Sequence, residues 1–331
     1  MGRQATSLAR GRLRALCSSG LDADALRRAL RARLHALLPF DAYCVNTADP
    51  ETLAITSSVG DGLSADEASR LFAIEAAGND VNPLRALARA HPHVAAIGRE
   101  PERSERMRAL FLPRGWVDEL RAALVERDRC WGYLHLFRST PFTRAELRLV
   151  ARLVTEIGGA LRMAHREPVD ARAELVPGVI VVGPGGRVLA RTRAGEGALS
   201  SLPRDAAHDG APHAVVEAAS RAIASGGSAE SHVATAHGLL RVVATVEEDC
   251  AVVVVDRARS RDVTRLLLAV HRLSPREEEV CRAMLRGLSD DEIATSLGVG
   301  THTVKAHAKA LFAKLEVAGR GGLLAKVDLA G

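Results

Sequence analysis

The chain has 331 residues, of which 47% are hydrophobic and 26% are charged, a composition typical of globular proteins that hold more than one domain. No stretch approaches the roughly 18 consecutive apolar residues that indicate a membrane-spanning helix, so a membrane partner is not expected. The five cysteines are scattered without a Cys-x-x-Cys pair, a pattern that argues against a disulfide framework or a cysteine-ligated zinc ion and favours a cytoplasmic protein.

The first part of the chain predicts a basic leader followed by an α+β domain. Residues 1–20 are rich in arginine and poor in acids, which favours an exposed amphipathic helix over a targeting peptide. Residues 21–165 open with leucines at helical spacing, namely Leu26, Leu30, Leu34 and Leu37. Strand-like runs follow at residues 41–47, 52–59 and 130–137.

A long helix is predicted to close this region, beginning after Thr143. Its apolar residues recur at alternating spacings of three and four: Leu147, Val150, Val154, Ile157 and Leu161. Two heptads are fewer than a firm coiled-coil prediction needs, so two interpretations stay open. This face either contacts a second copy of the chain or packs on the sheet of its own domain.

Residues 172–258 predict a second α+β domain with an antiparallel sheet. Two β-branched runs flank the Gly-Pro-Gly-Gly sequence at 183–186, which indicates a hairpin. No Gly-Lys-Ser/Thr follows these glycines, so they do not form a phosphate-binding loop. A helix near 212–224 and three further strands are expected, and residues 259–272 are interpreted as a helical connector.

Residues 273–331 are dense with signals for helix ends. Ser274 with Glu277, and Ser289 with Glu292, each form the sequence pattern of a capping box, and glycines stand where the first two helices should stop. Two short helices followed by a basic helix from Gly300 predict a helix-turn-helix arrangement. We therefore expect an all-α domain at this end of the chain.

The predicted third helix has one apolar face and one cationic face. At 100° per residue, one narrow stripe holds Val304, Ala308, Leu311 and Leu315. The opposite side holds His302, Lys305, Ala306, Lys309 and Ala313. The chain has only four lysines, all in its last 27 residues, whereas its other 41 basic residues are arginines. An ordinary solvated helix usually mixes charges of both signs, so the acid-free face favours contact with double-stranded DNA.

This segment closely resembles the LuxR-type helix-turn-helix domain of bacterial transcription regulators. The matching residues are Leu273 to Glu277, Glu292 to Ala294, Leu297 to Val299, Thr303 to Lys305, His307, and Lys314 with Leu315. Gly300 departs from the family pattern, which usually has Ser or Thr at the cap of this helix.

The resemblance implies roles for individual residues. Lys305, Ala306 and Lys309 would meet base edges and nearby phosphates, with His302 on the same face. Thr301, Thr303 and Lys314 would hold the DNA backbone. His307 matches a family position, and both a DNA contact and a packed histidine remain open for it. A fourth helix would contribute to dimerisation through its apolar residues, Leu323, Leu324 and Val327.

The preceding regions resemble sensor domains. Residues 21–165 look like a GAF domain, because Pro39 to Tyr43 precede a strand, Cys130 to Gly132 open another, and a long helix closes the region. Residues 172–258 more weakly resemble a PAS domain. Such folds commonly enclose a small pocket on the sheet. Its candidate lining residues are Tyr43, Cys44, Trp116, Trp131 and Tyr133, and packing in the core is the alternative for each.

The sequence thus predicts a multidomain α+β sensor region, GAF-like and then PAS-like, followed by an all-α helix-turn-helix domain. We expect a one-component, signal-responsive transcription regulator that binds double-stranded DNA as a homodimer. A small-molecule effector and RNA polymerase are further expected partners. No catalytic set, cofactor or metal site stands out. The alternatives are a phosphorylation-controlled response regulator and a ligand-processing enzyme with an accessory DNA-binding domain.

Overall fold

The computed structural model describes residues 3–61, 63–165, 175–203, 211–235 and 238–330, and these divide into two compact units. The first unit holds two five-stranded sheets. The second holds the helices from α8 onward together with the adjoining ends of β8 and β9. The predicted domain boundary between 165 and 172 lies outside the described residues. Among the described helices, none is long and apolar enough to cross a membrane.

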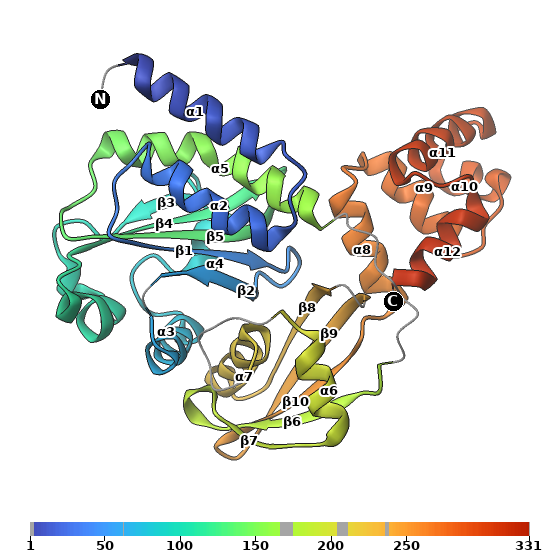
Figure 1. Cartoon of the computed structure of the whole chain (residues 1–331). Coiled ribbons are helices and arrows are strands. Elements are labelled where there is room, and N and C mark those ends of the chain that lie inside the picture. Colours follow the sequence, from blue (N-terminus) through green and yellow to red (C-terminus); the bar gives the residue numbers. More distant parts are fainter. Residues whose placement is uncertain (1–2, 62, 166–174, 204–210, 236–237, 331) are drawn as a thin grey trace. The chain divides into compact units, whose positions relative to one another are not determined.

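The first sheet consists of β1 (Ala42–Ala48), β2 (Ile55–Gly60), β3 (Val94–Ala96), β4 (Asp118–Glu126) and β5 (Arg129–Arg138). The helices around it are α1 (Arg3–Cys17), α2 (Ala23–His35), α3 (Ala65–Ala77), α4 (Leu84–Arg89) and α5 (Arg144–Ala164). The strands are antiparallel in the order β2-β1-β5-β4-β3, and α1, α2 and α5 cover one face of the sheet (Figure 1). The three strands expected here are confirmed, whereas β3 and β4 were not predicted.

Helix α5 packs on the sheet of its own domain, which decides between the two interpretations of its apolar face. Val150, Val154, Ile157 and Leu161 are all at most 3% exposed, and α5 lies against β4 and β5. A Cβ at Gly158 would stand only 2.7 Å from the carbonyl oxygen of Leu124. The close approach of helix and strand therefore requires glycine at this position.

The predicted leader forms helix α1. Leu13 is fully buried, and α1 contacts both α2 and α5. Arg14 Nε lies 3.1 Å from Glu156 Oε1 on α5. The helix was predicted correctly, but the expectation of a separate exposed leader was wrong, because α1 buries its apolar side against α2 and α5 in the helical layer that covers the first sheet.

The second sheet consists of β6 (Gly178–Val182), β7 (Val188–Arg191), β8 (Ser228–Thr235), β9 (Gly238–Glu247) and β10 (Cys250–Arg257). Helices α6 (Arg193–Ser201) and α7 (His213–Ser225) accompany it. Its order is β7-β6-β10-β9-β8, and the predicted hairpin is confirmed as β6 paired antiparallel with β7. Gly185 and Gly186 in the turn have φ of 73° and 78°, a left-handed conformation that glycine adopts without strain.

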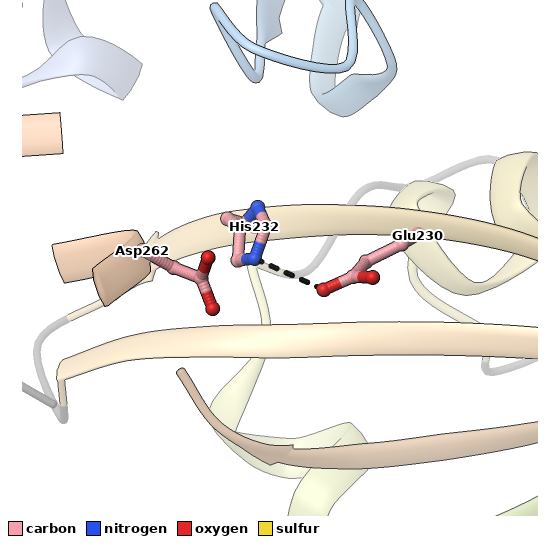
Figure 2. Close-up of side chains that lie close together, drawn as sticks. All are labelled: Glu230, His232 and Asp262. Carbon is pink, nitrogen blue, oxygen red and sulfur yellow. Dashed lines mark ion pairs between the residues drawn. The ribbon is translucent and has the colours of Figure 1, made fainter. Parts of the chain in front are cut away.

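A histidine of β8 connects the two sheets of the first unit. The Nδ1 atom of His232 lies 3.1 Å from Asp49 Oδ2, just after β1. Its Nε2 lies 3.4 Å from Glu230 Oε1 (Figure 2). Burial disfavours ionised Asp49, but His232 outweighs this effect, so the pKa of Asp49 is lowered. Asp49 also accepts a hydrogen bond from the backbone N–H of His232 at 2.9 Å.

The second unit is helical. Its helices are α8 (Ser260–Val270), α9 (Pro275–Leu285), α10 (Asp290–Leu297), α11 (Thr301–Leu315) and α12 (Arg320–Ala330). The predicted connector is confirmed as α8, and the four helices predicted after it are all present. Val280, Ile293, Val304 and Leu311 are fully buried in a single core that α9, α10 and α11 share.

Candidate nucleic-acid interface

The capping boxes predicted for α9 and α10 are both formed. Ser274 Oγ accepts from the backbone N–H of Glu277 at 3.3 Å, while Glu277 Oε2 accepts from the backbone N–H of Ser274 at 2.7 Å. Ser289 and Glu292 repeat this pair with the same two distances. Gly298 ends α10 with φ of 65°. These local bonds fix where each short helix begins and ends, and they set the turn that leads into α11.

Helix α11 turns one face to the core and the other to solvent, as its sequence predicts. Its buried side chains are Val304, Ala308, Leu311 and Leu315. Its outward side chains, all exposed, are His302, Lys305, Ala306, Lys309 and Ala313. We call these five residues the α11 outer face. The two alanines leave the helix backbone accessible beside the two long cationic side chains.

Acidic side chains near α11 are engaged by other partners. Glu277 Oε2 lies 2.6 Å from Lys314 Nζ, and Asp291 Oδ1 accepts from Thr301 Oγ1 at 2.7 Å. Asp290 Oδ1 lies 2.9 Å from the guanidinium of Arg320. Within the residues that the structure describes, Lys305 and Lys309 have no ion pair. Their ammonium groups are therefore available to an external anion.

Lys314 differs from these two lysines because it is bound inside the domain. Burial disfavours the ionised form of Glu277, but Lys314 and the backbone N–H of Ser274 outweigh that effect and lower the pKa of the Glu277 carboxyl. The Lys314 backbone oxygen also lies 2.8 Å from His271 Nδ1. Its predicted phosphate contact would need this ammonium to serve Glu277 and the DNA together, and it stays a prediction.

The remaining predicted contact residues lie at the edge of the α11 outer face. Thr301, Thr303 and His307 are half-buried. No side chain caps the start of α11 at Gly300, where the backbone is extended with φ of −76°. The roles of these residues toward DNA stay predictions.

Helix α12 buries most of its predicted dimerisation residues within the chain. Leu323 and Val327 are 1% and 4% exposed, whereas Leu324 is 42% exposed. Lys326 Nζ donates to the backbone oxygen of Leu315 at 2.7 Å, which satisfies a carbonyl at the end of α11. Among Leu323, Leu324 and Val327, only Leu324 has an exposed side chain that can contact a second copy.

The predicted pocket residues do not gather in one place. Cys44 lines a cavity of about 170 Å³, and Tyr133 lines a second cavity of about 300 Å³. Tyr43 lies beneath Arg31 of α2, and Trp116 stacks on Phe137 with ring centroids 5.3 Å apart. Trp131 is fully buried and does not line either cavity.

A buried charge network beside the first cavity was not predicted. Glu119 Oε2 lies 2.6 Å from Arg106 Nε, and Glu119 Oε1 lies 2.8 Å from Arg121 Nε and 3.0 Å from His135 Nδ1. Burial opposes ionisation of Glu119, but the two guanidiniums outweigh it and hold the pKa of this carboxyl well below its ordinary value. Glu119 and Arg121 are two residues apart in a strand, and this same-face pair of opposite charges was the available signal.

Comparison with known proteins identifies one part of the second unit. Residues 271–326 match the luxR family of bacterial regulatory proteins. This segment therefore forms a LuxR-family helix-turn-helix domain. A protein of Aeromonas salmonicida named as an HTH-type transcriptional regulator is 44% identical over 52 residues, which are 16% of this chain. The match covers 26% of that relative's length, so it concerns this domain and not the whole protein.

Two solved structures are similar in outline. One is the phycoerythrobilin-bound GAF domain of a cyanobacterial phytochrome, with 15% identity, a TM-score of 0.34, and coverage of 49% of this chain and 96% of that one. The other is SdiA of Escherichia coli, with 12% identity, a TM-score of 0.38, and coverage of 98% and 97%. Both TM-scores are too low to carry an argument. In the LuxR-family domain, α11 occupies the position of the third helix, which the sequence predicts to contact DNA.

Proposed function

We propose that this protein is a sequence-specific DNA-binding transcription regulator, with α11 as its recognition helix. The observation that carries the proposal is the α11 outer face, where Lys305 and Lys309 stand one turn apart without an ion pair among the described residues. The similarity of this domain to an HTH-type transcriptional regulator of Aeromonas salmonicida supports the same function.

The shape of the α11 outer face suits a major groove. The groove of B-DNA is about 12 Å wide and admits a single helix. Ala306 and Ala313 keep the centre of the face low, so the helix backbone can approach the bases closely. Lysine is a flexible point charge that can reach a phosphate or a base acceptor, so Lys305 and Lys309 can contribute to both affinity and register.

Regulation by a signal and dimerisation complete the proposal. The α+β region is proposed to receive a small-molecule signal and to transmit it through α8 as a one-component sensor. Two copies would place their α11 helices in successive major grooves of a pseudo-palindromic site. Leu324, an exposed apolar residue of α12, is the candidate contact between copies. RNA polymerase is a further candidate partner.

The DNA-binding function is tested with the full chain and a duplex selected by it from a random pool. Fluorescence anisotropy over a series of salt concentrations gives the affinity and the slope of log K against log salt. Lys305→Ala and Lys309→Ala are each expected to weaken binding, and each lysine that meets a phosphate reduces the slope by about 1 when removed. The double variant should show the sum of both slope changes.

The matched control removes two exposed cations elsewhere. Arg148→Ala with Arg152→Ala on α5 changes the net charge equally, and it should leave the slope unchanged because these residues lie in the other compact unit. Wild-type affinity and slope in the Lys305/Lys309 double variant would defeat the proposal. An equal loss in the control variant would show that binding follows net charge and not the α11 outer face.

A further inference from the structure

The 170 Å³ cavity of the first unit holds two buried polar atoms without a partner. Arg121 Nη2 and Asn46 Oδ1 form no hydrogen bond, although Arg121 is 1% and Asn46 is 3% exposed. Both residues line the cavity. Buried polar groups in folded proteins are nearly always hydrogen-bonded, so an unsatisfied donor and acceptor on two residues that line one cavity indicate a binding site for a small polar molecule.

The rest of each side chain is held in place. Arg121 Nε donates to Glu119 at 2.8 Å and its Nη1 donates to Glu75 at 2.7 Å, which leaves Nη2 as a donor directed at the guest. Asn46 Nδ2 donates to Ser58 Oγ, so its Oδ1 is left as an acceptor. These bonds preorganise one donor and one acceptor before any guest enters.

The positions of the two residues in the sheet set the span between them. Asn46 lies on β1 and Arg121 on β4, with β5 between, and Arg121 pairs with His135 while Asn46 pairs with Tyr133. Two strand spacings amount to about 10 Å across the sheet, and the two-residue offset along β5 adds about 7 Å in the perpendicular direction. Both side chains line the same cavity, so one small molecule inside it can reach both.

The charges around the cavity favour a neutral guest. Arg28, Asp61, Glu75 and Arg121 are the Lys, Arg, Asp and Glu side chains of its lining, and their formal charges cancel. The guanidinium of Arg121 is already paired with two carboxylates, Glu75 and Glu119. A guest carboxylate would therefore be buried beside two others without a new cation, and a carbonyl oxygen avoids this penalty.

The size and the walls of the cavity limit the guest to a single ring. A cavity of about 150 Å³ is large enough for benzene, whereas drug-sized ligands occupy about 300 Å³ or more. Phe72 of α3 and Phe137 of β5 line the cavity together with His135. The rings of His135 and Phe137 lie nearly parallel, with an interplanar angle of 11°. Such walls suit a flat, mainly apolar molecule.

We propose that this cavity binds a neutral, single-ring molecule of the amide class, whose carbonyl oxygen accepts from Arg121 and whose N–H donates to Asn46. This ligand would be the signal in the proposed sensing function, on which the proposal rests. Binding itself can be measured without DNA, so its failure is distinguishable from failure of DNA binding.

The test is isothermal titration of the full chain with three probes of similar size. Benzamide carries the neutral carbonyl and the N–H, benzoate carries a carboxylate, and toluene carries neither. Benzamide is expected to saturate one site per chain, with benzoate and toluene at least about tenfold weaker, the difference that loss of one or two buried polar contacts produces. The proposal would be overturned if benzamide did not bind, or if benzoate or toluene bound as tightly as benzamide.

Two variants locate the site. Asn46→Ala should weaken benzamide binding by about two- to tenfold and toluene binding less, because toluene makes no hydrogen bond to the Asn46 side chain. Ala68→Leu fills the cavity from α3 and should abolish benzamide binding, whereas Ala145→Leu, the same change at an exposed position of α5, should not. Circular dichroism melting verifies that each variant is folded. Wild-type benzamide affinity in Ala68→Leu would place the ligand elsewhere and refute the assignment.

A separate experiment tests whether benzamide binding changes the affinity for DNA. Lys305→Ala/Lys309→Ala should bind benzamide as the wild type does, since its substitutions lie in the other unit. Saturating benzamide is expected to shift the affinity of the wild-type chain for its selected duplex. Saturable binding with no change in DNA affinity would support the cavity chemistry and refute its sensing role.

Discussion

Replacing Glu217 with glutamine is expected to stabilise the first unit at alkaline pH and to have little effect at acid pH. Glu217 lies on α7 and is 6% exposed. Burial, with a smaller contribution from the nearby Glu75 carboxylate, raises the pKa of Glu217 from 4.5 to about 7, although Arg221 and Arg85 oppose the shift. The folded chain therefore favours the protonated carboxyl, which glutamine resembles in shape and charge.

The sign and the size of this stability difference follow from the folded and unfolded pKa values of Glu217. Because the folded pKa lies above the unfolded one, the contribution of Glu217 to stability is fully present below pH 4.5 and is lost as the pH rises through about 7. The shift corresponds to about 3 kcal/mol, at 1.36 kcal/mol for each pKa unit. The advantage of Glu217→Gln over wild type should thus grow from below about 1 kcal/mol at pH 5 to about 3 kcal/mol at pH 8.

Urea unfolding at these two pH values measures the difference. Both tryptophans of the chain, Trp116 and Trp131, lie in the first unit, so their fluorescence reports on its unfolding. Glu247→Gln, at an exposed position of β9, is the matched control and should show no such pH dependence. If Glu217→Gln differs from wild type by the same amount at both pH values, the argument that burial perturbs this carboxyl is refuted.

Two further predictions concern the LuxR-family domain. Lys314→Ala leaves the buried Glu277 without its cation and should destabilise the domain by about 1 kcal/mol, a modest value because solvent screens the 40% exposed lysine side chain. Urea unfolding should show this loss and no loss for Lys305→Ala, and equal stability of the two variants would contradict the ion-pair argument. Gly300→Ser supplies the missing cap oxygen on an extended backbone and should raise stability by about a few tenths of a kcal/mol. The same midpoint shift for Gly300→Ala would show that the cap oxygen is not the cause.

Local sequence signals predicted the elements whose ends depend on neighbouring residues. The capping boxes at Ser274 and Ser289 join residues only three positions apart, so the starts of α9 and α10 could be predicted from the chain alone. The same holds for the β6–β7 hairpin, which is set by its glycine turn. Strand β4 was missed because Glu119 and Arg121 make its sequence look polar, and their partners Arg106 and Glu75 come from distant segments.

The sequence by itself determined the α11 outer face, because helical periodicity alone decides which side chains of one helix share a side. It could not decide which lysines of α11 remain available to DNA. Lys305 and Lys314 are alike in sequence, and only the fold brings Glu277 to within 2.6 Å of the latter. The face against which α5 packs and the pairing of Arg121 beside the cavity were likewise decided by tertiary structure. Each depends on contacts between residues far apart in the chain, which no local pattern encodes.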